Sequence, residues 1–425
     1  MGNIQNYEQY YIKTLQEPFL IDYELITIGK LFDEIGYKLW IVGGAVRDHI
    51  INSEVNDIDL ATNATPDDIL SSKLIDIFKI DDNSSKFGNL IFYLNDKKYE
   101  VTSLRCDLKT YGRYAEVIFT KDLLVDAKRR DFTFNALYLS LDGRLFDPLN
   151  AYPDVISRKI KSIGKIEYKI IEDHSRILRY FRFYAQFFKD NANSKELDVC
   201  FKNIGLLKKL SAERLRLEIL KLFSVINSNK IIEIFIQGGV FEALSLKVKP
   251  SSLLPVINSI QQNNNLSISD DFRFAMAIKD DLNRGEYEVI LEKFDFNKSS
   301  KKFILNVLAF DKIHIEDLRI QMNFLLYKNG KVETRYLIIF NWACNHIIGE
   351  DKQWIDLLNL LELSKIPVFP LKARDLVSFG YKEGKEIGQA LREIESFWIE
   401  SNFTKNKREL IELYMELLPS DKGRQ

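Results

Sequence analysis

The chain has 425 residues, 46% of them hydrophobic, and its 60 lysines and arginines almost balance its 61 acidic residues. Such a length exceeds what one hydrophobic core organises, so we expect two to four packed units. The neutral total excludes a protein coated in positive charge, although a local basic stripe is enough to engage phosphates. Three dispersed cysteines, an N-terminus without a signal-peptide pattern and the lack of an apolar run of bilayer length predict a cytoplasmic protein.

The first third of the chain has a mixed α and β pattern. The elements expected there are a helix at 22–35 and strands at 37–42, 90–94, 99–104, 115–119 and 134–139. A polar turn at 95–98 predicts that two of these strands form a hairpin. From about Ile170 onward, apolar residues recur at helical spacing, with Asn- and Ser-rich breaks near 190–194, 226–229, 250–270 and 297–301. We therefore predict an α+β fold with a long helical remainder.

A Gly-Gly pair follows the strand expected at 37–42. Two glycines at this place permit a tight turn and a close approach of the backbone to a ligand. If a helix follows, its free N–H groups can bind phosphate, and Arg47 can add a charged fork. Considered alone, Gly43 and Gly44 are equally consistent with an ordinary turn before a helix.

The segment NDIDL at residues 56–60 places two acids two positions apart. In a strand, Asp57 and Asp59 would point to the same face. Neighbouring carboxylates repel each other unless a cation holds them, and Mg²⁺ prefers carboxylate and phosphate oxygens. Two such ions would activate an attacking hydroxyl and stabilise a leaving pyrophosphate. A solvated acidic loop is the alternative interpretation of an isolated pair.

Two more charged features complete the first third of the chain. Glu100 interrupts an apolar strand, so it either faces solvent or points at the same metal ions. The segment KRRDFTFN at 128–135 brings three bases next to Asp131. These residues could hold a triphosphate and a ribose hydroxyl, or they could form only a charged surface turn.

Taken together, GGAVRD, DID and RRDFTFNA closely resemble the head domain of class II tRNA nucleotidyltransferases and bacterial poly(A) polymerases. That family has a polymerase-β-like nucleotidyltransferase head. The resemblance implies that Asp57 and Asp59 are catalytic carboxylates that bind Mg²⁺, with Glu100 as the candidate for a third. It also implies nucleotide-binding roles for Gly43, Gly44, Arg47, Arg130, Asp131 and Asn135.

The segment EDHSRILR at 172–179 opens the helical part. In one continuous helix, Glu172 and Asp173 would each share a face with Arg176, as in an ordinary surface helix with acids near its N-terminus. Beside the head motifs, this segment resembles the nucleotide-selecting motif ED-x-x-R of the same family. The resemblance assigns base reading to Asp173 and Arg176, orientation of Arg176 to Glu172, and phosphate or base contact to Arg179.

An acid beside an arginine can imitate the edge of a nucleobase. The carboxylate of Asp173 accepts hydrogen bonds and Arg176 donates them, so the pair matches cytosine and adenine and mismatches guanine and uracil. A good bidentate contact of this kind discriminates by roughly 1–3 kcal/mol. Further along, the segment SAERLRLE at 211–218 resembles the helix that stabilises the family's neck, and we expect Glu213 and Arg214 to support the site without reacting.

The segment from Arg105 to Val117 resembles the family's flexible loop, which helps to switch specificity from C to A. Matches fall at Arg105, Asp107, Gly112 and Arg113, whereas tyrosines stand in place of the family's acid and histidine. An ordinary hairpin loop is the alternative. Family members that make poly(A) usually carry a basic segment before the second hairpin, and SSKFGN at 84–89 takes its place here, which favours tRNA repair.

Near the C-terminus, glycines recur at four-residue spacing around two lysines. This pattern suits a backbone approach to RNA phosphate, with Lys382, Gly384 and Lys385 as candidates, although a Gly-rich turn between helices explains it equally well. The resemblance divides the chain into a head (1–150), a neck with the nucleotide-selecting helix (151–225), a helical body (226–300) and a helical, RNA-binding tail (301–425).

The predicted activity is the addition of CCA to the 3′ end of tRNA from CTP and ATP, with Mg²⁺ as cofactor. We expect the protein to recognise the acceptor by the shape and backbone of the tRNA. An A-adding enzyme or a poly(A) polymerase of the same family is the first alternative. A catalytically silent RNA-binding protein is the second, and the presence of Asp57, Asp59 and Asp131 counts against it.

Overall fold

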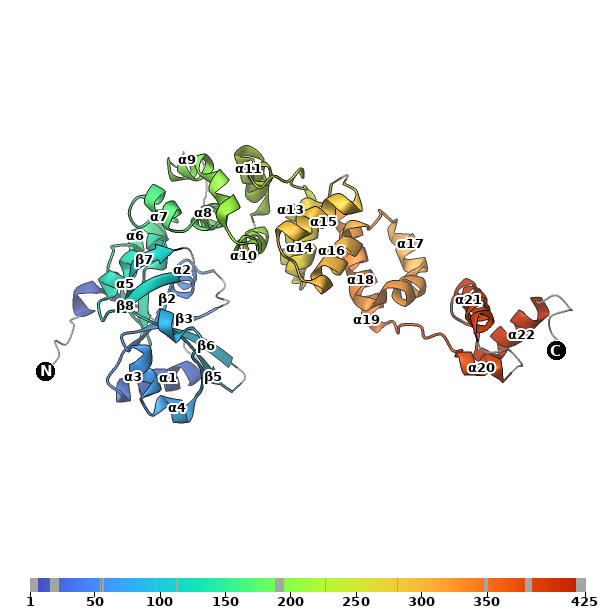
Figure 1. Cartoon of the computed structure of the whole chain (residues 1–425), viewed down its shortest axis with the longest axis horizontal. Coiled ribbons are helices and arrows are strands. Elements are labelled where there is room, and N and C mark those ends of the chain that lie inside the picture. Colours follow the sequence, from blue (N-terminus) through green and yellow to red (C-terminus); the bar gives the residue numbers. More distant parts are fainter. Residues whose placement is uncertain are drawn as a thin grey trace. The chain divides into compact units, whose positions relative to one another are not determined.

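The computed structural model describes residues 7–15, 23–53, 55, 57–95, 97–111, 114–187, 195–225, 227–280, 282–347, 351–378 and 384–417. The chain divides into two compact units, Met1–Lys247 and Val248–Gln425 (Figure 1). The first unit contains the expected head and neck, and the second is helical throughout its described part. No described helix is long and apolar enough to cross a membrane.

A mixed eight-stranded sheet organises the head, in the order β1-β10-β9-β2-β3-β6-β5-β4, and a separate two-stranded sheet pairs β7 with β8. The central strand β2 is buried at all four residues and runs antiparallel to both β3 and β9. The strands are β1 (Tyr11–Thr14), β2 (Leu39–Val42), β3 (Asp59–Thr62), β4 (Lys79–Asp81), β5 (Asn89–Leu94), β6 (Lys97–Ser103), β7 (Arg105–Tyr111), β8 (Tyr114–Phe119), β9 (Tyr138–Ser140) and β10 (Arg144–Phe146).

Short helices surround the sheet. Helices α1, α3 and α4 lie together at the end of the head that is remote from α8 and α10 (Figure 1). Phe32 of α1 packs on Phe92 of β5 with ring centroids 5.9 Å apart, which fixes α1 against the sheet. The head contains η1 (Tyr7–Tyr10), α1 (Tyr23–Glu34), α2 (Gly44–Ile50), α3 (Pro66–Leu70), α4 (Leu74–Ile77), η2 (Ser85–Phe87), α5 (Leu123–Arg129) and η3 (Thr133–Asn135).

The structure confirms the helix expected at 22–35 and the strand expected at 37–42, and it corrects two other strands. The strand expected at 134–139 begins only at Tyr138, because residues 133–135 form the 3₁₀ turn η3. Strand β6 begins at Lys97, so the hairpin turn is shorter than the expected 95–98. Asn95 takes a positive φ of 54° there, a conformation that asparagine tolerates better than most residues.

The neck helices pack against the head through aromatic rings. Phe134 of η3 contacts Phe183 and Phe187 of α8 with centroid distances of 5.0 and 5.6 Å, which holds α8 over the turn that follows α5. The helices of this part are α6 (Tyr152–Ile156), α7 (Ile166–Glu172), α8 (Arg176–Phe187), α9 (Lys195–Lys202), η4 (Ile204–Lys209), α10 (Ala212–Phe223), α11 (Ser228–Gly238) and α12 (Val240–Ala243).

The second unit corrects the loop expected at 250–270, where helix α13 occupies most of the segment. Its Leu254, Ile257 and Ile260 lie on one helical face and are fully buried, so burial outweighs the polar composition of the segment. The helices are α13 (Leu253–Asn264), α14 (Asp270–Ile278), α15 (Arg284–Lys293), α16 (Lys298–Leu308), α17 (Ile315–Ile320), α18 (Met322–Cys344), α19 (Lys352–Leu363), α20 (Ala373–Val377), α21 (Lys385–Glu400) and α22 (Lys407–Leu417).

Candidate functional site

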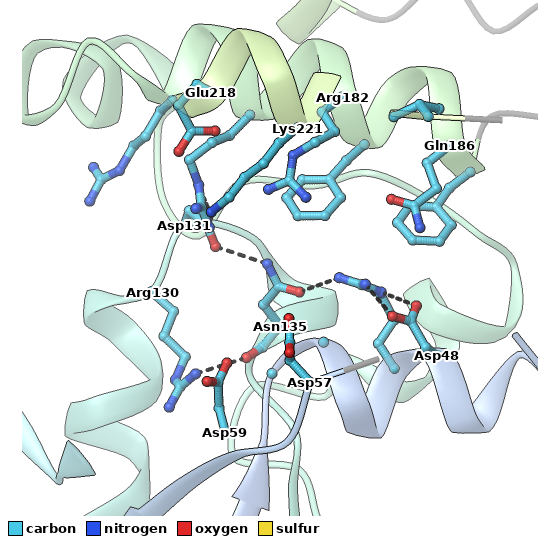
Figure 2. A pocket seen from close by; sticks show the side chains of 18 of the residues that line it. Asp48, Asp57, Asp59, Arg130, Asp131, Asn135, Arg182, Gln186, Glu218 and Lys221 are labelled. Atoms are coloured by element: carbon cyan, nitrogen blue, oxygen red, sulfur yellow. Dashed lines mark hydrogen bonds and ion pairs between the residues drawn. The ribbon is translucent and has the colours of Figure 1, made fainter. Parts of the chain in front are cut away.

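A cavity of about 1030 Å³ lies between the head and the neck helices of the first unit. Its lining brings together twelve of the residues singled out in the sequence. They are Gly43, Gly44, Arg47, Asp57, Asp59, Arg130, Asp131, Asn135, Asp173, Arg176, Arg179 and Arg214. Figure 2 shows Asp57, Asp59 and Arg130 on the head side of the cavity and Arg182, Glu218 and Lys221 on the opposite side.

The turn between β2 and α2 depends on glycine. Gly43 has φ 72° and ψ −128°, which an L side chain rarely adopts. A Cβ atom there would point to the space between Arg130 and Asp59, 3.8 Å from Nη1 of the former and 4.0 Å from Oδ2 of the latter. The lack of a side chain therefore keeps the approach to both charged groups open.

Asp57 and Asp59 lie in the same cavity, but they do not share a strand as expected. Strand β3 begins at Asp59, and Asp57 precedes it. Both residues are exposed, and neither forms a hydrogen bond or ion pair within the described part of the chain. Enclosure of the carboxyl by the cavity walls raises the pKa of Asp59, and the negative charges of Glu100 and Asp57 raise it further.

Glu100 lies beside the cavity and does not line it. The parallel pairing of β3 with β6 places Glu100 directly opposite Asp59. Its carboxylate, however, is 2.6 Å from Nζ of Lys98, and its side chain is 54% exposed. No group of three or more His, Cys, Asp or Glu side chains suited to a metal ion occurs among the described residues. A role for Glu100 as third carboxylate therefore stays a prediction.

Arg130 is aimed at the cavity by Asp126, a buried acid that the sequence interpretation missed. Both oxygens of the Asp126 carboxylate are engaged, by Nε of Arg129 at 2.7 Å, by Arg130 at 3.1 Å and by the hydroxyl of Tyr138 at 2.7 Å. Burial alone would raise the pKa of Asp126, but Arg130 and Arg129 lower it to about 2. The signal for this role was the spacing of an acid with arginines three and four residues later, at the end of a helix.

Asp131 joins the head to helix α8. Its carboxylate accepts hydrogen bonds from Nε of Arg179 at 2.7 Å, from the amide of Asn135 at 3.1 Å and from the backbone N–H of Phe132. Asn135 in turn accepts from Nη1 of Arg47 at 2.8 Å, and Arg47 also pairs with Asp48. Asp131, Asn135 and Arg47, all predicted to bind nucleotide, are thus linked to one another by hydrogen bonds, and Asp131 holds Arg179.

The nucleotide-selecting segment is not one helix, contrary to the expectation from its spacing. Helix α7 ends at Glu172 and α8 begins at Arg176, because Asp173 has the extended angles φ −150° and ψ 106°. Asp173 therefore does not pair with Arg176. Its carboxylate accepts from Nη2 of Arg214 at 2.7 Å and from the hydroxyl of Ser175 at 2.8 Å.

Glu172 holds Arg176, as the sequence predicted. Oε2 of Glu172 lies 2.7 Å from Nη1 of Arg176, and the same nitrogen donates to the carbonyl of Lys169 at 2.8 Å. On the other side of the break, burial would raise the pKa of Asp173, but the hydrogen bond and charge of Arg214, together with the hydrogen bonds from Ser175, lower it. Asp173 therefore stays an acceptor next to the donor Arg176, on the wall of one cavity.

The remaining predicted residues lie outside the cavity lining. Arg105 and Asp107 are close together on β7, with Nε of the former 3.5 Å from Oδ1 of the latter, while Gly112 and Arg113 lie outside the described residues. In the second unit, Gly384 has φ 137° and immediately precedes α21, which begins at Lys385. Lys382 also lies outside the described residues.

The sequence interpretation assigned no role to several further cavity residues of the neck, among them Arg182 and Gln186 of α8, and Glu218 and Lys221 of α10. The side chains of all four are labelled in Figure 2 along the helical side of the cavity. A signal for Arg182 existed in the recurrence of arginine at 176, 179 and 182, since residues three apart share a helix face. The resemblance of residues 211–218 to the family's neck helix indicated that α10 supports the site, but not that Glu218 and Lys221 line the cavity.

Comparison with known proteins agrees with this architecture. The family model described as "Poly A polymerase head domain" matches residues 39–161. The mouse protein named "CCA tRNA nucleotidyltransferase 1, mitochondrial" is 30% identical over 401 residues, which cover 91% of this chain and 88% of the relative. The Lactobacillus helveticus protein named "CCA-adding enzyme" is 27% identical over 391 residues, which cover 90% of this chain and 94% of the relative.

Solved structures show the same fold. The CCA-adding enzyme of Bacillus stearothermophilus, solved in complex with CTP, matches with a TM-score of 0.72 at 22% identity, covering 95% of this chain and 98% of that one. The Thermotoga maritima CCA-adding enzyme, solved with tRNA, matches with a TM-score of 0.59 at 18% identity, covering 96% of this chain and 99% of that one.

The mixed sheet of the head, the Gly-Gly turn beside two acids and the helical neck above them define a template-independent nucleotidyltransferase with a polymerase-β-like head. Identity of 30% with a relative that is covered almost completely narrows the class further. The chain belongs to the family of CCA-adding tRNA nucleotidyltransferases.

Proposed function

We propose that this chain adds CCA to the 3′ end of tRNA, using CTP and ATP and no nucleic-acid template. One observation carries the proposal: a single cavity holds two unpaired acids, Asp57 and Asp59, together with a fixed acceptor and donor, Asp173 and Arg176. The acids suit phosphoryl transfer, and the acceptor and donor suit the recognition of a base. Relatives across most of the chain's length are named for this activity.

Asp57 and Asp59 have the chemistry of a magnesium site. Burial first, and then the negative charges of Glu100 and Asp57, raise the pKa of Asp59. Mg²⁺ binds through one or two carboxylates together with substrate phosphates, so two acids are enough. When bound, the ion would supply positive charge to the transferring phosphate and lower the pKa of the attacking hydroxyl.

The side chains of the head then have separate tasks. Arg130, held by Asp126, presents its guanidinium next to Gly43 and supports the triphosphate, whose oxygens suit a forked donor. Gly43 leaves room for the phosphates to come close to Asp59. Asp131, Asn135 and Arg47 keep the head and α8 in register, so that the acids and the base-reading residues face one substrate.

Base selection would rest on Asp173 and Arg176. Arg214 keeps Asp173 ionised and in place, and Glu172 holds Arg176 in place. A carboxylate that accepts and a guanidinium that donates complement the edges of cytosine and adenine, while guanine and uracil present the opposite order of groups. The protein would thus replace the template strand.

We also propose the finer assignments that follow from family resemblance. Glu100 is the candidate third carboxylate, and the hairpin that carries Arg105 and Asp107 assists the change from C to A. Gly384 and Lys385 would contact tRNA phosphates in the tail. The division into head, neck, body and tail is a further proposal of this kind. A cytoplasmic location is another, and some relatives are named as mitochondrial proteins.

The deciding experiment offers the purified chain three forms of one tRNA, ending before CCA, at CC, or with complete CCA, each with single nucleotides and with CTP plus ATP. We expect CMP addition to the first form, AMP addition to the second, and none to the third. Addition of AMP alone would indicate an A-adding enzyme, and continued addition of AMP would indicate a poly(A) polymerase. A protein that binds tRNA and adds nothing would contradict the proposal.

A further inference from the structure

The charged side chains that line the cavity fall into two groups. Most are paired with another charged residue of the first unit, namely Arg47 with Asp48, Arg129 and Arg130 with Asp126, Asp131 with Arg179, Asp173 with Arg214 and Arg176 with Glu172. Six have neither a hydrogen bond nor an ion pair from their side chains within the described residues: Asp57, Asp59, Arg158, Arg182, Glu218 and Lys221. The first two form the proposed magnesium site, and three of the others gather on the neck.

Arg182 and Glu218 are the most unusual of these. Nε of Arg182 and Oε2 of Glu218 are buried, and neither has a hydrogen-bond partner in the described part of the chain. A buried polar atom without a partner costs about 1–3 kcal/mol, and most such atoms in proteins are satisfied. A donor and an acceptor left unsatisfied together in a cavity wall indicate a ligand that supplies the complementary groups.

These residues occupy a definite place along the neck helices. On α8, Arg176, Arg179 and Arg182 follow at intervals of three and share a face. Arg182 lies roughly 9 Å along the helix axis from Arg176, more than twice the spacing of about 3.4 Å between stacked nucleotides. On α10, Glu218 and Lys221 follow Arg214, which holds the base-reading Asp173. The unpaired residues are therefore a separate subsite beyond the base-reading end.

We propose that Arg182, Glu218 and Lys221 hold the last nucleotide of the acceptor RNA, an inference that rests on the proposed function. Two cations and one acid carry a net charge of +1, which suits a single phosphodiester. The acid Glu218 would repel a triphosphate, so the incoming nucleotide is the poorer match. Arg182 can donate to a base or ribose oxygen, and Glu218 can accept from a hydroxyl or an exocyclic amine.

The position of Lys221 suits this role. In Figure 2 its side chain extends from the helical side of the cavity toward the head. Lys221 lines the same cavity as Asp59. An acceptor phosphate at Lys221 would therefore place the terminal 3′ hydroxyl within reach of the proposed magnesium site, where it must attack.

Steady-state kinetics with tRNA ending in CC and with ATP test this assignment. In Lys221→Gln, Arg182→Gln and Glu218→Gln, we expect the KM for tRNA to rise by about tenfold, which is about 1.4 kcal/mol. The KM for ATP should stay within about twofold of the wild type, because the nucleotide site is intact. Lys209→Gln, at an exposed residue of η4, is the matched control and should change neither constant.

A binding measurement separates this inference from the proposed activity. Fluorescence anisotropy without nucleotide compares tRNA ending in CC with the same tRNA lacking those two cytidines. The wild type should prefer the longer RNA, and Lys221→Gln, whose side chain is exposed and whose fold is checked by its Tm, should lose that preference. An unchanged preference, or a rise in the KM for ATP alone, would overturn the assignment even if CCA addition is confirmed.

Discussion

The carboxylate of Asp131, in the head, accepts a hydrogen bond from Nε of Arg179, in α8, across 2.7 Å. Burial would raise the pKa of Asp131, but Arg179 and Asn135 outweigh burial and lower it, so the acid stays ionised. This pair connects the segment that carries Arg130 with the helix that begins at Arg176. The two ends of the proposed site therefore depend on one interaction.

Breaking that pair should destabilise the first unit. Asp131→Asn removes the charge that compensates Arg179, and loss of one partner of a buried ion pair costs about 3–5 kcal/mol. Because the side chain of Arg179 is 30% exposed, we expect the lower end of that range. Denaturant unfolding measures the effect. The control is Asp33→Asn, which removes an exposed ion pair with Lys38 and should change the free energy of unfolding only slightly. An equally small change in Asp131→Asn would show that this residue does not connect the head to α8.

Gly43 should be sensitive to a single added methyl group. In Gly43→Ala, the strained backbone should cost about 1–2 kcal/mol of stability, and the Cβ atom should obstruct the phosphates and lower kcat/KM. Gly36→Ala is a matched control, since its φ of 83° is similarly strained and a Cβ there would meet nothing within 4 Å. Stability should fall in both variants and activity only in Gly43→Ala. Equal activity in the two would exclude a close approach of substrate to Gly43.

The base-reading residues should control selectivity more than rate. Asp173→Ala or Arg176→Ala removes one partner of a bidentate contact worth about 1–3 kcal/mol, so preference for CTP over UTP should fall by about tenfold or more. Arg214→Gln should act in the same direction, because Asp173 loses its strongest partner. Competition between CTP and UTP for incorporation into tRNA measures the ratio. Unchanged selectivity in all three variants would mean that the base is read elsewhere.

Asp59 should make the metal-free protein less stable above its raised pKa. A carboxyl whose pKa is higher in the folded than in the unfolded state opposes folding when it is ionised, and this cost disappears as the pH falls through the folded value. Without magnesium at pH 8, Asp59→Asn should therefore have a higher Tm than the wild type. The difference should shrink on acidification, or when Mg²⁺ is added. A variant less stable than wild type at every pH would contradict this.

The residue patterns of short segments predicted those parts of the site whose residues are close together in the sequence. The strand and glycines at 39–44 were predicted correctly, whereas Glu172 contacts Arg176 across a helix break that the spacing did not predict. The extended break at Asp173 was missed because its cause, the contact with Arg214, spans 41 residues. The apolar pattern around Phe134 indicated a strand, whereas packing against α8 places that ring in a 3₁₀ turn.

The spacing of residues along the sequence does not show the register in which strands pair or the way in which helices pack. The position of Glu100 opposite Asp59 follows from the parallel pairing of β3 with β6, and its ion pair with Lys98 depends on the same strand. The face of α10 that carries Glu218 and Lys221 was equally hidden, since only its packing beside α8 places it at the cavity. Family resemblance covered the head, the start of α8, the segment 211–218 and part of the tail, whereas the cavity positions of Arg182, Glu218 and Lys221 came from the structure.

The two acids remain the centre of the account, and single-turnover incorporation of nucleotide into tRNA tests them most directly. Asp57→Asn and Asp59→Asn, each assayed with CTP and with ATP in excess Mg²⁺, should lose at least about 10³-fold in rate, a loss of about 4 kcal/mol in transition-state stabilisation. Their affinity for tRNA should not fall, because these acids repel phosphate. Incorporation at the wild-type rate by either variant would contradict the assignment of the catalytic site.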